Sequence, residues 1–374
     1  MNIGIVTFHL ADNFGAVLQA YALQTYLYRA GHDAVIIDYQ PSYLTNGGGL
    51  RLPRSRRDLY VNATVLFIRL SRLRAALRGG KRTEAFRRFR ERMLSVGATT
   101  YPTLKALRAE PPAFDVYVCG SDQIWNPPPR AGVDPAFYLA FGDSSVRRVA
   151  YAASFGGAQV PQEYRQAIGQ LLTGLDAISV REESGVRLVQ ELSGRRAQWL
   201  PDPTLLLEDY RPLLVPPAED AFVFGYSVRT SALIGQVQDQ VAEACGVPLL
   251  TPYDPQQRWG ARSSRLDLGP AEWLGCIAQA RFVVTNSFHG TLFSVLFGKP
   301  FATVPLVGRH EELNERFRSM LFRLGLENRL LATEQQGDVR RLVETPIDWD
   351  AVSRRLDPWR TEAELFLADA LARG

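Results

Sequence analysis

Cysteine and histidine are both scarce in this chain of 374 residues, and each scarcity excludes a class of protein. The three cysteines, Cys119, Cys245 and Cys276, are far apart and odd in number. This spacing argues against a disulfide framework or a zinc site and favours buried free thiols in a reducing cytoplasm. Four histidines are too few for a multi-histidine metal centre. We therefore expect a cytoplasmic protein that uses no metal.

Several signatures of membrane proteins and of common enzyme classes are also missing. No run of about 18 apolar residues is present, so no transmembrane helix is expected, and the first residues lack the basic start of a signal peptide. There is no P-loop, because Pro300 follows Gly298-Lys299. There is no G-x-S-x-G nucleophile elbow, and His310-Glu311-Glu312 lacks the second histidine of a zinc-protease helix.

Positive charge is concentrated in one segment. Arg51–Met93 holds 14 Lys and Arg residues against 3 acidic residues, whereas the whole chain holds 43 against 39. The rest of the chain is therefore acidic, and nucleic acid is not an expected partner. Two basic helices, Asp58–Leu77 and Thr83–Met93, are predicted in this segment. They suit peripheral contact with the inner face of the cell membrane or with an anionic acceptor, although a solvated helical face explains the same pattern.

Alternating strand and helix patterns predict two α/β domains. Ile3–Phe8 and Ala34–Tyr39 have the pattern of strands and flank a helix at Ala16–Ala30, and such an opening favours a doubly wound parallel sheet. The proline-rich stretch Glu208–Asp220 indicates an interdomain linker. We expect an N-terminal Rossmann-like domain over residues 1–207 with a basic helical insertion at about 50–95, a second Rossmann-like domain over 221–345, and C-terminal helices over 346–374 that pack back across both.

The stretch Ala280–Pro305 predicts a β-loop-α-β unit with a polar loop. Phe282–Val284 has the composition of a buried parallel strand. The helix that follows would point its N-terminus, with its free N–H groups, at a phosphate or carboxylate beside His289. The alternative is that His289 is a hydrogen-bonded packing residue. The candidate residues of this loop are Asn286, Ser287, His289 and Gly290.

Further polar residues follow the ends of other predicted strands, where open α/β sheets bind ligands. They are Asn13, Gly15 and Gln19 after the first strand, Gly120, Ser121, Asp122 and Trp125 after Phe114–Cys119, Ser154 after Val149–Ala153, and Arg181 after Ala177–Val180. Arginine at a strand end suits a phosphate, or it forms a structural ion pair with nearby acidic residues. The Asn-Phe-Gly turn faces a ligand or simply builds the loop.

Six motifs together resemble the polysaccharide pyruvyl transferase family. They are F-H-x-A-D-N-F-G-A-x-L-Q-A-Y-A-L (Phe8–Leu23), F-D-x-Y-V-C-G-S-D-Q-I-W-N (Phe114–Asn126), A-Y-A-A-S-F-G (Ala150–Gly156), S-V-R-E-E-S-G (Ser179–Gly185), P-D-P-T (Pro201–Thr204) and T-N-S-F-H-G (Thr285–Gly290). The resemblance runs from Ile3 to about Arg329. It implies a GT-B-like fold, with two Rossmann-like domains facing a cleft.

The resemblance also implies an activity in the biosynthesis of envelope polysaccharides. A pyruvyl group would pass from phosphoenolpyruvate, a donor substrate rather than a bound cofactor, to two hydroxyls of a saccharide or lipid-linked saccharide, forming a ketal. His289 then matches the active-site histidine near the donor, and Arg181 matches an arginine that binds the donor's anionic groups. Asn13–Gln19 and Ser121–Trp125 would line the cleft.

Within this mechanism, His289 is the expected acid/base, because imidazole titrates near neutral pH. Asp122 or Asp202 would activate the acceptor hydroxyl, although the two prolines beside Asp202 are typical of a structural turn. Characterised members often carry an Arg-Leu pair before the histidine, where this chain has Ser287-Phe288. The missing charge would come from Arg181, the helix N-terminus, Arg309 or Arg316.

Two other functions fit the same pattern. One is a GT-B glycosyltransferase that uses a nucleotide sugar, and the other is a catalytically idle binding protein of the same fold. Neither the acceptor nor the oligomeric state follows from the sequence.

Overall fold

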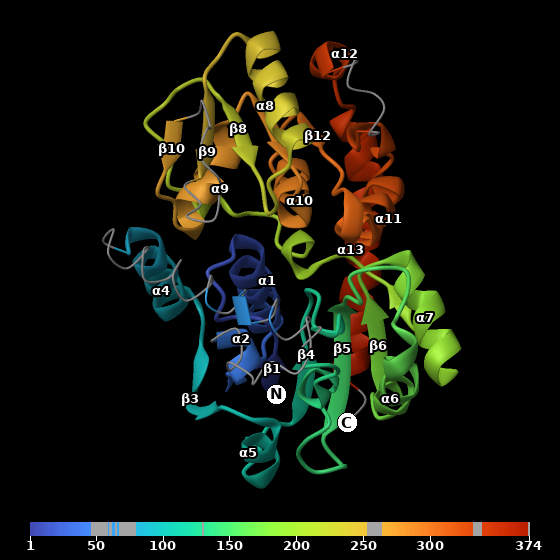
Figure 1. Ribbon diagram of the computed structural model, residues 1–374. Coiled ribbons are helices and arrows are strands. Elements are labelled where there is room, and N and C mark those ends of the chain that lie inside the picture. Colours follow the sequence, from blue (N-terminus) through green and yellow to red (C-terminus); the bar gives the residue numbers. More distant parts are fainter. Residues whose placement is uncertain are drawn as a thin grey trace.

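The computed structural model describes residues 1–45, 59, 62–63, 66, 80–128, 131–252, 264–331 and 339–372 of the chain. These residues form two parallel β-sheets flanked by helices, one sheet above the other in Figure 1. The fold is therefore α/β with two Rossmann-like domains, which confirms the expected fold class.

The first sheet has seven parallel strands in the order β3-β2-β1-β4-β5-β6-β7. The chain builds outward from β1 to one edge and then, from β4, to the other, which creates the switch point where such sheets bind ligands. The strands are β1 (Asn2–Val6), β2 (Asp33–Tyr39), β3 (Val96–Tyr101), β4 (Val116–Cys119), β5 (Arg147–Ala153), β6 (Ala177–Val180) and β7 (Gln198–Trp199). The helices are α1 (Phe14–Arg29), α2 (Ser42–Thr45), α4 (Lys81–Met93), α5 (Leu104–Ala109), α6 (Gln162–Thr173) and α7 (Glu183–Ser193).

The second sheet has five parallel strands in the order β10-β9-β8-β11-β12. Its strands are β8 (Val223–Tyr226), β9 (Leu249–Pro252), β10 (Ser264–Leu266), β11 (Phe282–Thr285) and β12 (Phe301–Thr303). The helices of this half are α8 (Ala232–Cys245), α9 (Pro270–Gln279), α10 (Phe288–Leu296), α11 (Glu315–Leu324) and α12 (Val339–Glu344), and the chain ends in α13 (Trp349–Ala372).

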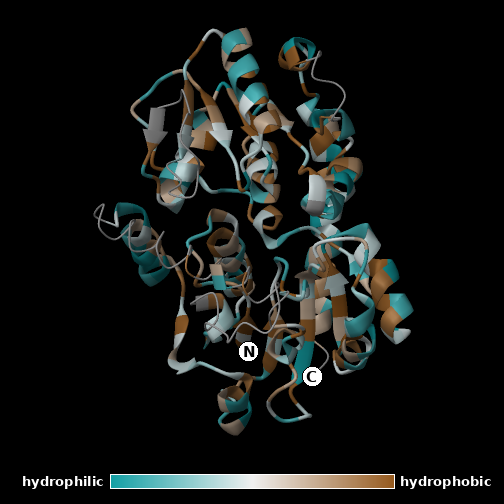
Figure 2. Cartoon of the chain, in the orientation of Figure 1, coloured by the Kyte–Doolittle hydropathy of each residue, from teal (hydrophilic) through white to brown (hydrophobic). Residues whose placement is uncertain are grey.

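The strands form where apolar runs can be covered by helices on both faces. β4 (Val-Tyr-Val-Cys) and β11 (Phe-Val-Val-Thr) are buried along their whole length, as expected for parallel sheets. Figure 2 shows the same division, with apolar residues along the strands and polar residues on the outer faces of the helices. Asn13 and Ser231 cap the helices that follow β1 and β8 by accepting from the backbone N–H of Ala16 and Ile234.

The two domains share one apolar core at their junction. Phe14, at the start of α1, stacks on Trp273 of α9 with ring centroids 5.0 Å apart and planes 7° apart. Trp273 in turn meets Phe293 of α10 edge-on at 5.5 Å. The start of α1 is therefore fixed against the helices of the second domain.

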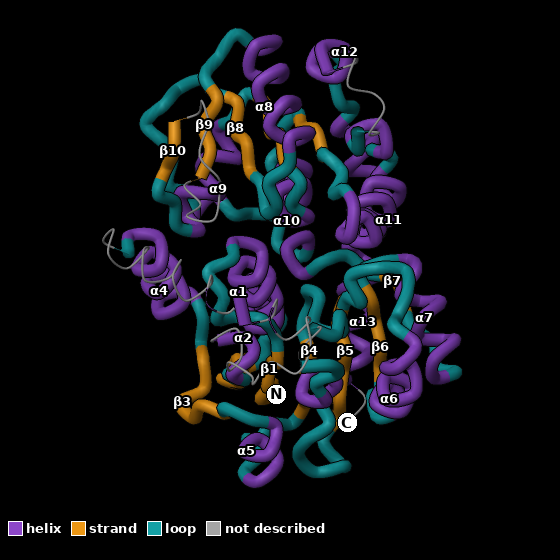
Figure 3. Tube along the Cα trace, in the orientation of Figure 1, coloured by secondary structure: helices purple, strands orange, loops and turns teal. Residues whose placement is uncertain are grey.

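Helix α13 ties the second domain to the first, and Figure 3 shows it running behind the first sheet. Trp359 Nε1 donates to the carbonyl oxygen of Trp199 at 3.1 Å, and Arg360 Nε donates to that of Leu205 at 2.6 Å. Farther along, Phe366 packs in the core of the first sheet against Tyr151.

Some elements differ from the sequence-based expectation. More than one helix was expected over residues 346–374, but the described part of this range forms one helix, Trp349–Ala372, with Pro358 inside it. Packing of Val352 and Leu356 against the second domain offsets the cost of that proline. β3 was not predicted, because it is a mostly exposed edge strand without apolar alternation. The expected helix Asp58–Leu77 lies largely outside the described residues.

Candidate functional site

Asp202 is the centre of a buried charged cluster at the carboxyl end of the first sheet. Its Oδ2 accepts from Ser121 Oγ at 2.9 Å and from Arg181 Nη1 at 2.7 Å. Its Oδ1 accepts from the backbone N–H of Thr204 at 3.0 Å and from Thr204 Oγ1 at 2.8 Å. Ser121 follows β4 and Arg181 follows β6, the two strands on either side of β5, so the carboxyl end of the sheet positions both partners.

His289 reaches this cluster from the second domain. Its Nε2 lies 3.4 Å from Asp202 Oδ2, but this contact does not have the geometry of a hydrogen bond. We treat it as an electrostatic contact that a small movement would convert to a hydrogen bond, as is common before substrate binds. The cluster therefore joins the two domains through charged groups.

Burial and charge oppose one another at the cluster. Burial alone would raise the pKa of Asp202, but His289 and Arg181 beside it hold that pKa below its ordinary value. Burial likewise works against the charge of Arg181, yet Glu182, Asp202 and Asp122 keep its pKa above the ordinary value. Asp202 and Arg181 are therefore ionised across the physiological pH range.

The loop before α10 fixes the position of His289. Ser287 caps the helix, because its Oγ accepts from the N–H of Gly290 at 3.2 Å. Asn286 holds the neighbouring loop by accepting from Val228 N–H at 2.8 Å and donating to Arg229 O at 2.6 Å. His289 consequently lies in the first turn of a capped helix, where free backbone N–H groups favour an anion.

Gly15 makes room for the histidine ring across the domain junction. A methyl group on Gly15 would lie 2.0 Å from His289 Nδ1, far inside contact distance. The Asn-Phe-Gly turn and His289, which are 274 positions apart in the chain, are thus packed together. Asn13 caps α1 by accepting from Ala16 N–H at 3.1 Å.

A second arginine lies next to the cluster. The guanidinium carbons of Arg181 and Arg316 lie 4.2 Å and 5.9 Å from the ring centroid of Phe288. Arg316 of α11 donates from Nε to Leu313 O at 3.1 Å. Burial, with the charge of Arg181 nearby, lowers the pKa of Arg316 to about 10. A bound anion would offset both effects, because it would add negative charge beside this buried guanidinium to that of Glu182 and Asp122 nearby.

Asp122 and Glu182 complete the charged groups around Arg181. Asp122 adopts a positive φ of 71°, which is rare for a residue other than glycine. This backbone holds its carboxylate 3.8 Å from Arg181 Nη2 and leaves it partly exposed. Glu182 is buried and accepts from Ser154 Oγ at 2.8 Å and from Arg181 Nε at 3.2 Å. Burial raises the pKa of Glu182 above its ordinary value.

Other expected binding residues form hydrogen bonds or packing contacts within the protein. Gln19 donates from Nε2 to Thr7 Oγ1 at 2.8 Å, although its Oε1 is buried without a partner among the described residues. The hydroxyl of Ser154 donates to Glu182. Trp125 is 1% exposed and donates to Phe137 O at 2.9 Å. Gly120 packs under Leu23, where a Cβ would lie 2.9 Å from that side chain. These residues position the groups around them.

The two prolines beside Asp202 suggested that it serves mainly to build a turn, yet it lies at the centre of the cluster. The turn is real, since Asp202 caps the short 3-10 helix Pro203–Leu205. The same side chain, however, binds Arg181 and faces His289. Arg309, the other suggested source of charge, has a side chain outside the described part of the chain. Across the described residues, no group of His, Cys, Asp and Glu side chains is arranged to hold a metal ion, and no helix is long and apolar enough to cross a bilayer.

Two solved structures with the same fold are UDP-N-acetylglucosamine 2-epimerases, one of them putative. A UDP-N-acetylglucosamine 2-epimerase from Neisseria meningitidis, bound to UDP-GlcNAc, matches with 10% identity, a TM-score of 0.52 and 100% coverage of both chains. A putative UDP-N-acetylglucosamine 2-epimerase from Listeria monocytogenes matches with 11% identity and a TM-score of 0.51, covering 98% of this chain and 95% of its own. At these identities the likeness concerns the fold alone. Curated protein sequences gave no significant match.

The family comparison reaches further than the fold. The sequence profile described as "Polysaccharide pyruvyl transferase" matches residues 13–305, which is more than half of the chain. This range contains the Asn-Phe-Gly turn, Arg181, Asp202 and His289, which the structure brings together at one site. The chain is therefore a transferase and belongs to the polysaccharide pyruvyl transferase family.

Proposed function

We propose that the protein transfers a pyruvyl group from phosphoenolpyruvate to two hydroxyls of a saccharide, forming a cyclic ketal and releasing phosphate. The observation that carries the proposal is the meeting of His289 Nε2 and Arg181 Nη2 beside Asp202. Both nitrogen atoms are buried without a hydrogen-bond partner among the described residues. Buried polar groups are rarely left unpaired, so a ligand is the natural partner for both.

The donor supplies the anionic groups that the site lacks. Phosphoenolpyruvate carries a phosphate and a carboxylate, and guanidinium groups bind both well. We place these two groups between Arg181, Arg316 and the N-terminus of α10. Arg316 supplies the charge that Ser287 does not, because its guanidinium lies over the adjacent Phe288.

The reaction then needs one proton donor and one proton acceptor. His289 protonates C3 of the enol, which leaves C2 cationic. A sugar hydroxyl forms a bond to C2 and releases its proton to Asp122, the partly exposed carboxylate of the cluster. The C2–O bond to phosphate breaks, and the second hydroxyl closes the ketal while its proton leaves with phosphate. Fixed positive charge at the departing phosphate is the largest expected contribution to the rate.

The acceptor in this proposal is a saccharide or lipid-linked saccharide at the inner face of the cell membrane. The basic segment Arg51–Met93 would provide the membrane contact. Helix α4 forms most of its described part and carries Arg87, Arg88 and Arg92 on its exposed surface. Nucleic acid has no role in this proposal.

Incubation with phosphoenolpyruvate and a glycan panel tests the proposal. Phosphate release that depends on the acceptor, with a ketal detected by mass spectrometry, is expected. His289→Ala should lower the rate by about a thousandfold, the scale of lost acid-base catalysis, whereas His32→Ala, at a distant turn, should not. Full activity in His289→Ala would exclude the mechanism. Thermal stabilisation by UDP or GDP, but not by phosphoenolpyruvate, would instead favour a nucleotide-sugar donor.

A further inference from the structure

The carboxylate of Asp202 already accepts four hydrogen bonds within the first domain. Its Oδ1 accepts from the backbone N–H and from the hydroxyl of Thr204, at 3.0 and 2.8 Å. Its Oδ2 accepts from Ser121 Oγ at 2.9 Å and from Arg181 Nη1 at 2.7 Å. An ionised carboxylate has about four lone-pair sites, two on each oxygen atom. The sites of Asp202 are therefore all occupied by groups of its own domain.

This saturation explains the state of His289. Its Nε2 lies 3.4 Å from Asp202 Oδ2, yet it has no hydrogen-bond partner among the described residues. A buried N–H group beside a carboxylate normally bonds to it, because an unpaired buried donor has lost the hydrogen bonds that water supplied. Both sites on Oδ2 are taken, so a hydrogen bond from His289 would require Ser121 or Arg181 to withdraw.

Arg181 and Ser121 occupy these two sites in different ways. The guanidinium of Arg181 is forked, so it can bind the donor through Nη2 while Nη1 stays on Asp202. The hydroxyl of Ser121 has a single hydrogen atom. Arg181 Nη1, 3.5 Å from Ser121 Oγ, can only donate, and the carboxylate of Asp202 can only accept. The Ser121 hydrogen is therefore directed at Asp202.

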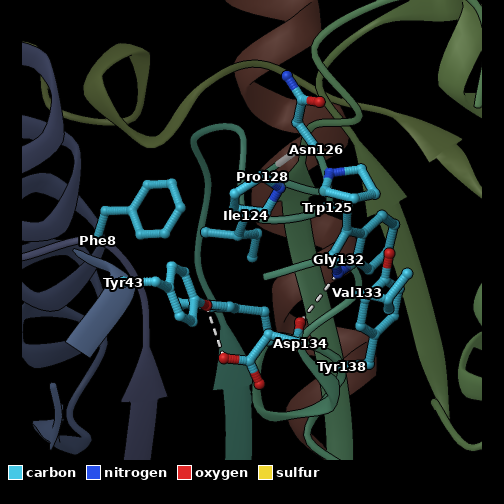
Figure 4. Close-up of a pocket in the computed structure, with 12 residues that line it drawn as sticks. Phe8, Tyr43, Ile124, Trp125, Asn126, Pro128, Gly132, Val133, Asp134 and Tyr138 are labelled. Carbon is cyan, nitrogen blue, oxygen red and sulfur yellow. Dashed lines mark hydrogen bonds between the residues drawn. The ribbon is translucent and has the colours of Figure 1, made fainter. Parts of the chain in front are cut away.

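The loop that carries Ser121 is fixed on both sides of this residue. The carbonyl oxygen of Ser121 accepts from Thr7 Oγ1 at 3.4 Å, and Thr7 Oγ1 in turn accepts from Gln19 Nε2 at 2.8 Å. Farther along the loop, Trp125 stacks on Tyr138, both drawn in Figure 4, with ring centroids 5.1 Å apart and planes 3° apart. Ser121 is itself fully buried. Its hydroxyl is therefore held in one place beside Asp202.

We propose that Ser121 is a positioning residue for His289, because its hydroxyl occupies the lone pair of Asp202 Oδ2 that would otherwise hold the Nε2 proton. That proton then stays directed at the bound donor, while the negative charge of Asp202 still stabilises the imidazolium through space. The inference rests on the proposed function for the use of this proton, which passes to C3 of the enol. It adds a residue that acts on the reaction through His289 and needs no contact with either substrate.

The state of His289 can be measured without any substrate. The full chain has four histidines, so its nitrogen-15-labelled imidazole signals are few, and a His289→Gln variant identifies those of His289. In Ser121→Ala, the Nε2 proton of His289 should give a downfield resonance that exchanges slowly with water, as a proton bonded to a carboxylate does. Wild type should lack this resonance. Thr204→Val is the matched control and should also lack it, because it removes a hydroxyl from Oδ1, whereas His289 contacts Oδ2.

Turnover measures the consequence for the reaction. Ser121→Ala should lower kcat about tenfold or more, because a charged hydrogen bond must break before Nε2 can face the donor. The concentration of phosphoenolpyruvate needed for half-maximal thermal stabilisation should not change. Ser179→Ala removes another buried hydroxyl, one that bonds to the backbone of β5, and should leave kcat unchanged. Ser121→Cys keeps a weaker donor and should show smaller changes of the same kind, so it serves as the test if the alanine variant does not fold.

Each outcome decides for or against the positioning role. The downfield resonance in the Ser121 variants only, with a lower kcat and unchanged stabilisation by phosphoenolpyruvate, supports it. An unchanged His289 spectrum in these variants overturns it, as does the same resonance in wild type or in Thr204→Val, or a wild-type kcat in a variant that shows the resonance. Weaker stabilisation by phosphoenolpyruvate in parallel with kcat also overturns it, because Ser121 would then act through Arg181. If the resonance appears as expected but wild type transfers no pyruvyl group, the positioning of His289 stands and the proposed reaction fails.

Discussion

Replacing Gly15 by alanine puts a methyl group into the ring of His289. The new Cβ would lie 2.0 Å from Nδ1, 2.5 Å from Cγ and 2.7 Å from Cε1. These atoms belong to one rigid ring, so the ring or the whole domain must shift by roughly 1.4 Å to restore ordinary contact. Gly15 does not have a positive φ, so alanine fits the backbone of α1.

Stability and activity should therefore respond differently to Gly15→Ala. Overpacking costs about 1–3 kcal/mol, and the helix gains up to about 1 kcal/mol from alanine. The net loss of folding free energy, measured by urea unfolding, should be about 0–3 kcal/mol. Displacement of His289 by about 1 Å should lower the transfer rate about a hundredfold.

Two variants make this result interpretable. Gly235→Ala in α8 has no atom within 4 Å of the new Cβ, so it should stabilise the protein by up to about 1 kcal/mol and leave activity unchanged. Gly15→Ala combined with His289→Ala should recover the folding free energy lost to overpacking. Wild-type activity in Gly15→Ala, or no recovery in the double variant, would show that the two domains do not meet in this way in the working protein.

Two further predictions address charge. Arg316→Met removes a charged hydrogen-bond donor, so it should raise the concentration of phosphoenolpyruvate needed for half-maximal thermal stabilisation by about tenfold or more. Arg318→Met, on the exposed face of the same helix, should leave that concentration unchanged. Equal effects of the two variants would refute the assignment of Arg316 to the donor. Burial would raise the pKa of Asp38, but hydrogen bonds from His9, Thr100 and Gln40 lower it. Because the folded pKa lies below the unfolded one, its contribution is complete above about pH 4 and is lost as the pH falls through the folded value. Asp38→Asn should therefore lower the free energy of unfolding by about 1–3 kcal/mol at pH 7, and this difference from wild type in urea unfolding should shrink below about pH 4. A difference independent of pH would contradict this prediction, as would an equal loss in the exposed Asp33→Asn.

The fold was predictable because its strands have apolar sequences that are followed by polar loops. β1, β4 and β11 have this pattern, and parallel strands bring their carboxyl ends to the same edge of a sheet. That rule was enough to propose Arg181 and His289 as site residues. It could not show that they meet on Asp202, because the approach depends on how the two domains pack at Phe14 and Trp273.

Because the sequence does not show how the elements pack, it also left the roles of Arg316 and Asp202 undecided. Arg316 is one of several arginines in α11, and only packing distinguishes it, buried against Phe288, from the exposed Arg318. Asp202 caps a turn, as its flanking prolines suggest, but the capping carboxylate has a second oxygen that is free to bind Arg181. A sequence pattern can indicate one role of a side chain, but it does not show which of its hydrogen-bonding atoms remain available for a second partner.

A substitution at Ser287 tests whether a positive charge there can replace the charge of Arg316. The resemblance to the polysaccharide pyruvyl transferase family implies an arginine at this position in many members. Here Ser287 caps α10, and Arg316 brings a guanidinium to the neighbouring Phe288 from α11. If the two positions serve the same anion, Ser287→Arg should restore phosphoenolpyruvate binding to Arg316→Met, despite losing a cap worth about 1 kcal/mol. Ser231→Arg also loses a helix cap, that of α8, and should not restore binding. Rescue by both, or by neither, would mean that Arg316 does not substitute for a charge at the start of α10.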